Sequence, residues 1–338
     1  MTNKLNSDTN EVDAAPPLNE DKPTAFEEAT PLLPDLDSGE VLEGVSLEPS
    51  KTPFFQAVHA LRYQRQAIIK LIESRLMHPI ICYVSGNLSA IDRDDTIGFA
   101  DLLHNIPIGS DLDLLLHTGG GDIDAAEKII SLVRKRVGEG RLRIIIPDFA
   151  KSAGTLMALG ADSLVMSDTS ELGPIDPQIV LADGDGNRIR YSVQNYLDAY
   201  IAHSATLAAT PTNVPAQIML SKLDPGRVKL FESVRDRARN IAQNQLKRGM
   251  FRGGTGTSNY TKTASALLDT TRWLTHGQMI SWEDAADDEI GLTVEYLEPT
   301  SEEWQGYWQL YCLQRLAIGD RQKLFESNYA SLVVDGPA

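Results

Sequence analysis

Lys151-Ser152-Ala153-Gly154-Thr155 comes shortly after an apolar run, residues 142–147, and opens a series of small residues, 156–161. The apolar run is typical of a buried strand, and the small residues that follow are typical of a short helix. Ser152 then stands where the helix begins. Backbone amides at a helix start favour developing negative charge, and Ala153 and Gly154 leave room for a substrate chain.

A second pattern of the same kind lies upstream, in His117-Thr118-Gly119-Gly120-Gly121-Asp122. It too follows an apolar run and precedes an amphipathic segment, for which Asp122 is a suitable N-cap. Glycines let backbone N–H groups approach a substrate carbonyl closely. One turn therefore offers amides to an oxyanion and the other offers a hydroxyl nucleophile, which are the two halves of a serine acyl-transfer site.

The wider pattern predicts an α/β fold with a mostly parallel sheet, because short apolar runs alternate with helical segments. Ligands of parallel sheets bind outside the carboxyl ends of the strands, where both turns lie. Helical periodicity dominates after residue 194. Strands are expected over 79–85, 111–118, 142–147, 163–167 and 291–297, and helices over 96–105, 122–137, 153–160, 194–207, 215–223, 225–247 and 302–329.

The charge and composition of the chain argue against several classes of protein. The chain of 338 residues has a net charge of −16, which argues against a nucleic-acid partner, because phosphate binding needs a basic face. No apolar run reaches the ~18 residues of a membrane span, and the N-terminal residues lack the apolar region of a secretory signal. The two cysteines, Cys82 and Cys312, fit a reducing compartment. We therefore expect a cytoplasmic protein.

Three segments are expected along the chain. Residues 1–50 hold two lysines and twelve acidic residues with few aromatics, which predicts a disordered acidic tail. Residues 53–297 carry the alternating pattern and both turns. Residues 298–338 are expected to form a C-terminal helical extension.

Three segments of the sequence resemble the serine dehydrogenase proteinase family of the Clp-protease/crotonase superfamily, which is related to signal peptide peptidase A. They begin Leu-Leu-Leu-His-Thr-Gly-Gly-Gly-Asp at residue 114, Ile-Pro-Asp-Phe-Ala-Lys-Ser-Ala-Gly-Thr at residue 146 and Glu-Leu-Gly-Pro-Ile-Asp-Pro-Gln at residue 171. A further match starts with Trp-Leu-Thr-His-Gly-Gln at residue 273. The resemblance covers about residues 60–297.

The resemblance implies a serine peptidase on a Clp/crotonase-like spiral of βαβ units. Ser152 falls on the nucleophile, and Gly120 with the amide of Ala153 falls on the oxyanion hole. Gly121 falls on the second glycine of the strand-end pair. Superfamily members commonly assemble as trimers or stacked rings, so a homo-oligomer that acts on a peptide or protein substrate is expected.

The general base is not identified by the resemblance. Asp176 falls where Clp proteases carry a histidine, and we expect it to orient a base. No lysine falls near residue 192, where the signal-peptide-peptidase relatives carry theirs. Lys222, Lys229 and His276 remain as candidate bases; His276 would have a suitable pKa unaided. Lys151 is expected to point away from the reacting atom next to it.

Neither a metal nor a cofactor is expected, because the six histidines show no paired ligand spacing and the two cysteines lie far apart. The leading hypothesis is a serine endopeptidase with an acyl-enzyme on Ser152. One alternative is a crotonase-type enzyme that holds acyl-CoA enolates in the same oxyanion hole. The other is an inactive scaffold that oligomerises and presents its acidic tail to a partner.

Overall fold

The computed structural model describes residues 51–182, 188–253 and 259–336. The predicted disordered tail, residues 1–50, lies outside these ranges. Residues 53–338 form one compact unit.

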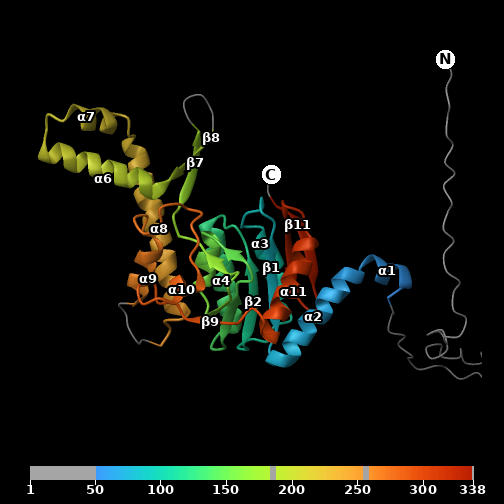
Figure 1. The fold of residues 1–338 in the computed structure, drawn as a ribbon. Coiled ribbons are helices and arrows are strands. Elements are labelled where there is room, and N and C mark those ends of the chain that lie inside the picture. Colours follow the sequence, from blue (N-terminus) through green and yellow to red (C-terminus); the bar gives the residue numbers. More distant parts are fainter. Residues whose placement is uncertain (1–50, 183–187, 254–258, 337–338) are drawn as a thin grey trace, which may run out of the picture. The chain divides into compact units, whose positions relative to one another are not determined.

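Helices and strands alternate through the first half of the unit (Figure 1). The helices are α1 (Pro53–Val58), α2 (Ala60–Leu76), α3 (Asp95–Leu103), α4 (Ile123–Val137), α5 (Ala153–Ala158), α6 (Val193–Ala209), α7 (Val214–Ser221), α8 (Pro225–Arg248), α9 (Asn259–Leu267), α10 (Trp282–Ala286) and α11 (Glu302–Leu316). The strands are β1 (Ile80–Ser85), β2 (Leu112–His117), β3 (Leu142–Ile145), β4 (Phe149–Ala150), β5 (Ser163–Met166), β6 (Glu171–Leu172), β7 (Gln178–Ala182), β8 (Arg188–Ser192), β9 (Val294–Tyr296), β10 (Gln322–Glu326) and β11 (Ser331–Asp335).

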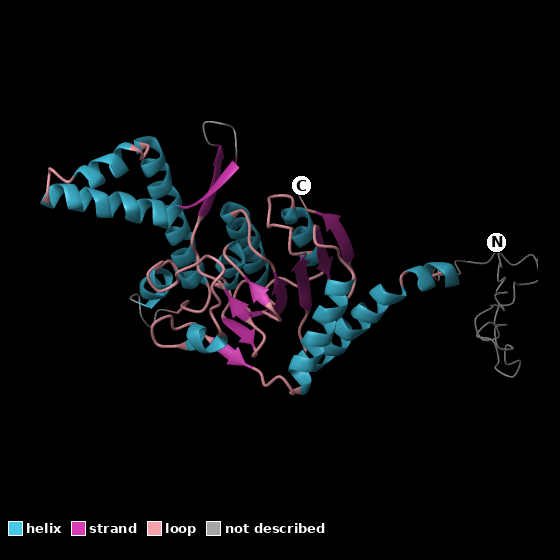
Figure 2. Ribbon diagram, turned by 45° about the horizontal axis from the view of Figure 1, so that its top comes forward, coloured by secondary structure: helices cyan, strands magenta, loops and turns pink. Residues whose placement is uncertain are grey.

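A seven-stranded sheet in the order β11-β10-β1-β2-β3-β5-β9 forms the centre of the unit (Figure 2). The five strands from β1 to β9 run parallel to their neighbours, whereas β10 and β11 are antiparallel. The prediction of an α/β fold with a mostly parallel sheet is confirmed. Parallel strands bring the ends of β2 and β3 to the same edge of the sheet, and both glycine and serine turns follow there.

Both faces of the sheet are buried, because alternate side chains of each strand enter different cores. In β1, Ile81 and Tyr83 belong to the larger core, with α3, α4 and α5, while Ile80 and Cys82 belong to the core beneath α2 and α11. Parallel strands covered on both faces read as continuous apolar runs, which is why these strands are visible in the sequence.

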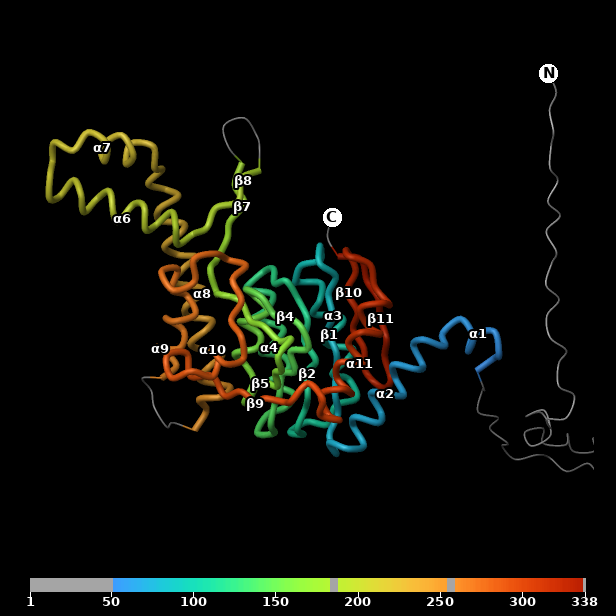
Figure 3. The backbone as a smooth tube through the Cα atoms, viewed as in Figure 1, coloured from blue at the N-terminus to red at the C-terminus, as the bar shows by residue number. Residues whose placement is uncertain are grey.

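The C-terminal region differs from the prediction. The helix expected over 302–329 ends at Leu316, and β10 and β11 then extend the central sheet beside β1, as Figure 3 shows in red. Residues 298–338 are therefore not a purely helical extension. Polar residues of β10 are buried because they are paired: Glu326 accepts hydrogen bonds from Arg65 at 2.9 Å. The partners of these polar residues lie far away in the sequence, so the strand itself carries no continuous apolar pattern from which it could be predicted.

Helix α8 joins the central unit to a smaller apolar cluster. Its N-terminal part packs Val228 and Phe231 with Val193 and Leu197 of the α6 region. Its C-terminal part belongs to the larger core through residues such as Ile241. Helices α6 and α7 pack against each other and lie at the end of α8 that is remote from the sheet (Figure 1).

Candidate active site

The two turns that the sequence singled out lie against each other. The Thr118 amide donates to the Phe149 carbonyl at 3.0 Å, and the Lys151 amide donates to the Thr118 carbonyl at 3.0 Å. A Cβ atom placed on Gly120 would lie 2.9 Å from the Cβ of Ser152. The expected meeting of glycine turn and serine turn at one sheet edge is thus present.

Ser152 has an unusual backbone conformation, with φ 53° and ψ −112°. Among the described residues other than glycine, only Met77 also has a positive φ. The Ser152 side chain makes no capping hydrogen bond to α5, which begins at the next residue. Backbone strain of this kind concentrates at functional sites and costs about 1–3 kcal/mol. The hydroxyl at this strained turn is therefore free of the capping role that serines commonly take at helix starts.

The amides around Ser152 differ in their partners. The Gly120 amide donates to Thr118 Oγ1 at 3.2 Å. Within the described ranges, the amides of Gly121 and Ala153 donate to no protein group. The family resemblance assigned the oxyanion role to Gly120 together with Ala153, but in this structure the Gly120 N–H is already engaged. Nothing in the sequence distinguished the three glycines by the direction of their amides.

The Gly121 amide faces away from Ile91. Ile91 donates to the Gly120 carbonyl at 2.8 Å and accepts from the Asp122 amide at 2.9 Å. Gly121 lies between these two groups in the bridge, and its own N–H does not donate to Ile91. Among the described residues it has no protein partner, so it is a candidate donor to a ligand.

Gly120 and Gly121 have no room for a side chain. Their φ angles are 98° and 153°. A Cβ on Gly121 would lie 2.3 Å from the carbonyl oxygen of Ile91, and a Cβ on Gly120 would lie 2.7 Å from that of Lys151. Both positions therefore require glycine on steric and conformational grounds.

Asp176 and His276, predicted as orienting group and candidate base, are neighbours. Leu172 and Ile280 form an antiparallel bridge, and Asp176 and His276 lie four residues beyond it along their two segments. His276 Nδ1 lies 3.8 Å from Asp176 Oδ2. That nitrogen is buried and has no hydrogen-bond partner among the described residues.

The segment that carries Asp176 is fastened to the helix that follows Ser152. Thr155 Oγ1 donates to the Gly173 carbonyl at 2.9 Å, and the Gly173 amide donates back at 3.2 Å. Ser192 Oγ also donates to Asp176 Oδ1, at 3.2 Å. Sequence reasoning missed Thr155 and Ser192 as members of this arrangement. Each is a small hydroxyl residue in a turn or at a helix start, which is too common a signal to single them out.

Lys151 joins the segments of Asp176 and His276 to the serine turn. Its Nζ lies 3.0 Å from Glu171 Oε1 and donates to the carbonyls of Leu172 at 3.0 Å and Gln278 at 3.4 Å. The ammonium group is therefore engaged away from Ser152, as the sequence led us to expect.

The other two lysine candidates lie elsewhere. Lys222 is exposed at the C-terminal end of α7. Lys229 is exposed on α8 and pairs with Glu232 at 3.1 Å. In the part of the chain that the structure describes, no hydrogen bond or ion pair connects either lysine to the two turns.

His117 is buried beneath the glycine turn. Its ring packs on Phe149 with centroids 4.1 Å apart, and its Nδ1 lies 3.3 Å from the hydroxyl of Tyr311, which donates to Asp148 at 2.6 Å. Burial, and then the charge of Arg315, lower the pKa of His117 to about 3. A neutral, fixed imidazole supports the prediction that this residue positions the turn.

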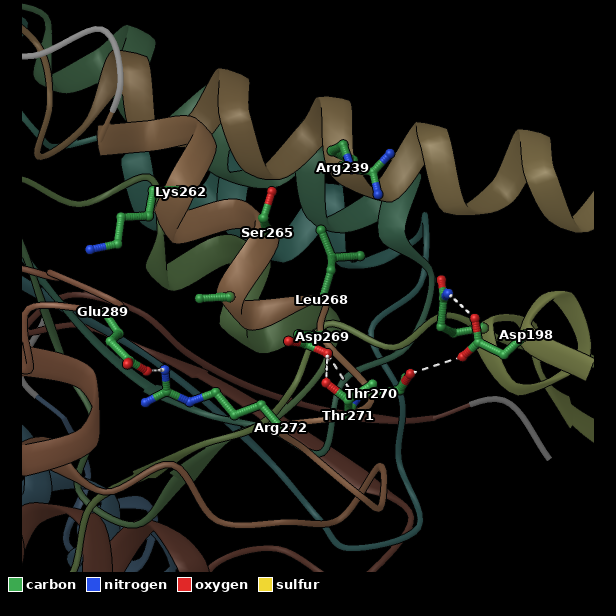
Figure 4. A pocket seen from close by; sticks show the side chains of 12 residues that line it. Asp198, Arg239, Lys262, Ser265, Leu268, Asp269, Thr270, Thr271, Arg272 and Glu289 are labelled. Carbon is green, nitrogen blue, oxygen red and sulfur yellow. Dashed lines mark hydrogen bonds and ion pairs between the residues drawn. The ribbon is translucent and has the colours of Figure 1, made fainter. Parts of the chain in front are cut away.

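A separate cavity of about 740 Å³ lies between α8, α9 and the segment that follows α9 (Figure 4). Thr270 Oγ1 donates to Asp198 at 3.2 Å across one side, and Arg272 pairs with Glu289 on another. None of the predicted site residues lines it. Its lining mixes both signs of charge, with cations from Arg239, Lys262 and Arg272 and carboxylates from Asp198, Asp269 and Glu289.

Two features are absent from the described residues. No group of three or more potential ligands that would hold a metal ion was found there. None of the helices in the described ranges is both long enough and apolar enough to cross a membrane.

Comparison with known proteins agrees with the sequence resemblance. The family model of the ClpP-like SDH-type serine proteinases matches residues 79–186. The uncharacterised protein MJ0137 of Methanocaldococcus jannaschii is 41% identical over 73 residues, which are 22% of this chain and 25% of that protein. A second protein of the same organism, MJ1495, is 27% identical over 158 residues, which are 47% of this chain and 50% of that protein. The chain thus spans half or less of the length of these relatives.

Two solved structures of the membrane-bound stomatin-specific protease 1510-N are also similar to this chain. One, in complex with a substrate peptide, has a TM-score of 0.36 and 14% identity over 63% of this chain and 77% of that one. The other has a TM-score of 0.27 and 17% identity over 66% of this chain and 99% of that one. The predicted family resemblance is confirmed by the family model: residues 79–186, which hold both turns, have the sequence pattern of the ClpP-like SDH-type serine proteinases.

Proposed function

We propose that this chain is a serine peptidase that cleaves peptide bonds through an acyl-enzyme on Ser152. The observation that carries the proposal is the strained, uncapped Ser152 turn packed against Gly120. The serine hydroxyl attacks the peptide carbonyl, the amine leaves, and water then hydrolyses the ester.

The oxyanion of the tetrahedral intermediate is held by the amides of Gly121 and Ala153. Both lack protein partners within the described ranges, and the absence of a side chain at Gly120 lets the glycine turn approach Ser152 closely. Loss of one preorganised donor from an oxyanion hole typically costs about 10²–10³ in kcat.

His276 is the general base of the proposed mechanism, and Asp176 orients it. Because Nδ1 of His276 is on the side of Asp176, Nε2 is the nitrogen left to accept the Ser152 proton. A small rotation of His276 would shorten the 3.8 Å separation to a hydrogen bond, and such contacts often tighten only when substrate binds. His276 then returns the proton to the leaving amine.

We also propose that the protein acts as a homo-oligomer in the cytoplasm, on peptide or protein substrates. Large apolar side chains exposed on α6 and α7 support an interface there: Ile201, Val214, Ile218 and Met219. Both cysteines are free, with Cys82 buried, which supports a reducing compartment.

The proposal is tested with a fluorophosphonate probe and a set of fluorogenic peptides. The wild-type protein is expected to be labelled once per chain and to hydrolyse at least one peptide, and Ser152→Ala is expected to lose both activities. Ser74→Ala, at an exposed serine of α2, is the matched control and should behave as wild type. Absence of labelling in a folded wild-type protein would overturn the proposal.

Calorimetry with acyl-CoA separates the rival functions. Saturable binding at micromolar concentration without labelling of Ser152 would favour a crotonase-type enzyme. Neither labelling nor acyl-CoA binding would favour an inactive scaffold.

A further inference from the structure

The loop of residues 86–92 connects the C-terminal hairpin to the glycine turn. On one side, the Gly86 amide donates to the Gln322 carbonyl and the Leu88 amide donates to the Asp320 carbonyl, both at 2.8 Å. On the other side, Ile91 exchanges two backbone hydrogen bonds with the glycine turn, at 2.8 and 2.9 Å. The loop therefore lies between β10 and the strand that carries the oxyanion donors.

Lys323 of β10 anchors the end of this loop. Its Nζ donates at 2.7 Å to both Asp92 Oδ2 and Asp95 Oδ1. The Lys323 side chain is 1% exposed and that of Asp95 is 2% exposed. Asp95 Oδ2 in turn accepts from the Asp92 amide at 3.0 Å and from the Tyr83 hydroxyl at 2.9 Å. One buried ammonium thus fixes both ends of the Asp92–Asp95 turn, directly after Ile91.

Stability alone is a poor explanation for this cluster. Removing charges from water costs several kcal/mol per ion, so apolar residues of similar volume often give equal or greater stability. Burial raises the pKa of Asp95, and the hydrogen bonds from Lys323, the Asp92 amide and Tyr83 oppose that rise. The cluster has a clearer effect on geometry than on stability, because it helps to hold Ile91 in place next to the glycine turn.

We propose that Lys323 is a positioning residue for the oxyanion donors: through Asp92 and Ile91 it fixes where the Gly121 amide lies relative to Ser152. The inference rests on the proposed function for its effect on catalysis. Its structural part, control of the glycine turn, holds independently of the chemistry. It also gives the C-terminal hairpin a role at a site whose sequence motifs lie within residues 79–186.

Asp92→Asn is the first test variant. Lys323→Met would leave the buried carboxylate of Asp95 without its cation and is at risk of not folding, whereas Asp92→Asn keeps the Lys323–Asp95 pair and nearly the same shape. Tyr83→Phe is the matched control, because it removes a hydrogen bond to Asp95 without touching the link through Asp92 to Ile91.

Two readouts separate positioning from the proposed function. Hydrogen exchange of the amides of Ile91 and Asp122 is expected to rise about tenfold in Asp92→Asn and to stay unchanged in Tyr83→Phe. For peptide hydrolysis, kcat is expected to fall about tenfold with KM unchanged, since only transition-state binding is affected.

Unchanged exchange and unchanged kcat in folded Asp92→Asn would overturn the inference. If the amides exchange faster in Asp92→Asn but the wild-type protein hydrolyses no peptide, the positioning role is upheld and the proposed peptidase function is rejected. A rise in KM alone would show that the loop acts on substrate binding, and would also overturn the inference.

Discussion

Nδ1 of His276 lies 3.8 Å from Oδ2 of Asp176, buried and without a hydrogen-bond partner among the described residues. The two residues come from segments far apart in the sequence that are joined by the antiparallel bridge of Leu172 and Ile280, beside α5. A buried nitrogen without a partner is costly unless the site uses it. We therefore propose this pair as the base and orienting group.

His276→Gln is expected to lower kcat for peptide hydrolysis by about 10²–10⁴, because it removes the proposed acceptor of the Ser152 proton. Asp176→Asn should also lower kcat, since it removes the carboxylate that sets the tautomer. A pH–rate profile checks the assignment, because the acid limb that a histidine base produces should be absent in His276→Gln. Lys222→Ala should leave the rate unchanged. A rate lost in Lys222→Ala and kept in His276→Gln would make Lys222 the base.

Gly120→Ala is expected to lower kcat/KM by at least about 10²-fold, because the new methyl group would lie 2.9 Å from the Ser152 Cβ and the φ of 98° is strained for alanine. Gly119→Ala is the control. Its Cβ meets no atom within 4 Å and its φ lies outside the left-handed region, so near wild-type activity and melting temperature are expected. Equal behaviour of the two variants would contradict the close packing of the turns.

His117 predicts a specific pH dependence of stability. Its folded-state pKa of about 3 lies below the ordinary value of 6.5, so the unfolded chain binds the proton first as the pH falls. The free energy of unfolding should decrease by about 2 kcal/mol between pH 7 and pH 5 because of this residue. Urea denaturation at both pH values checks it, with His117→Gln losing that difference. An equally steep decline in the variant would assign it to other groups.

The parallel core of the fold could be predicted because its strands are buried on both faces. Residues such as Ile81 and Leu114 lie in predominantly apolar runs, and amphipathic helices separate these runs. The helices from α6 to α8 were predicted nearly at their observed bounds.

Strands β10 and β11 could not be predicted in the same way. Lys323 and Glu326 are buried in β10 because Asp92, Asp95 and Arg65 pair with them, and those partners lie more than two hundred residues earlier. Local periodicity holds no trace of such contacts, so the aromatic pattern of α11 was extended too far.

The candidate site was predictable in parts. Ser152 and the glycine turn stand in short motifs directly after strands, so their meeting followed from the topology. The direction of each amide did not, because Thr118 Oγ1 decides which glycine N–H is free. The proximity of His276 to Asp176 depends on the path of the chain after α9, which no local pattern gives.

Trapping of the acyl-enzyme tests the central claim most directly. The protein is mixed with a p-nitrophenyl ester, quenched in acid within the burst phase, digested and analysed by mass spectrometry. We expect one acyl group per chain, located on Ser152, and none in Ser152→Ala. A folded wild-type protein that carries no acyl group, or carries it on another residue, would contradict the account.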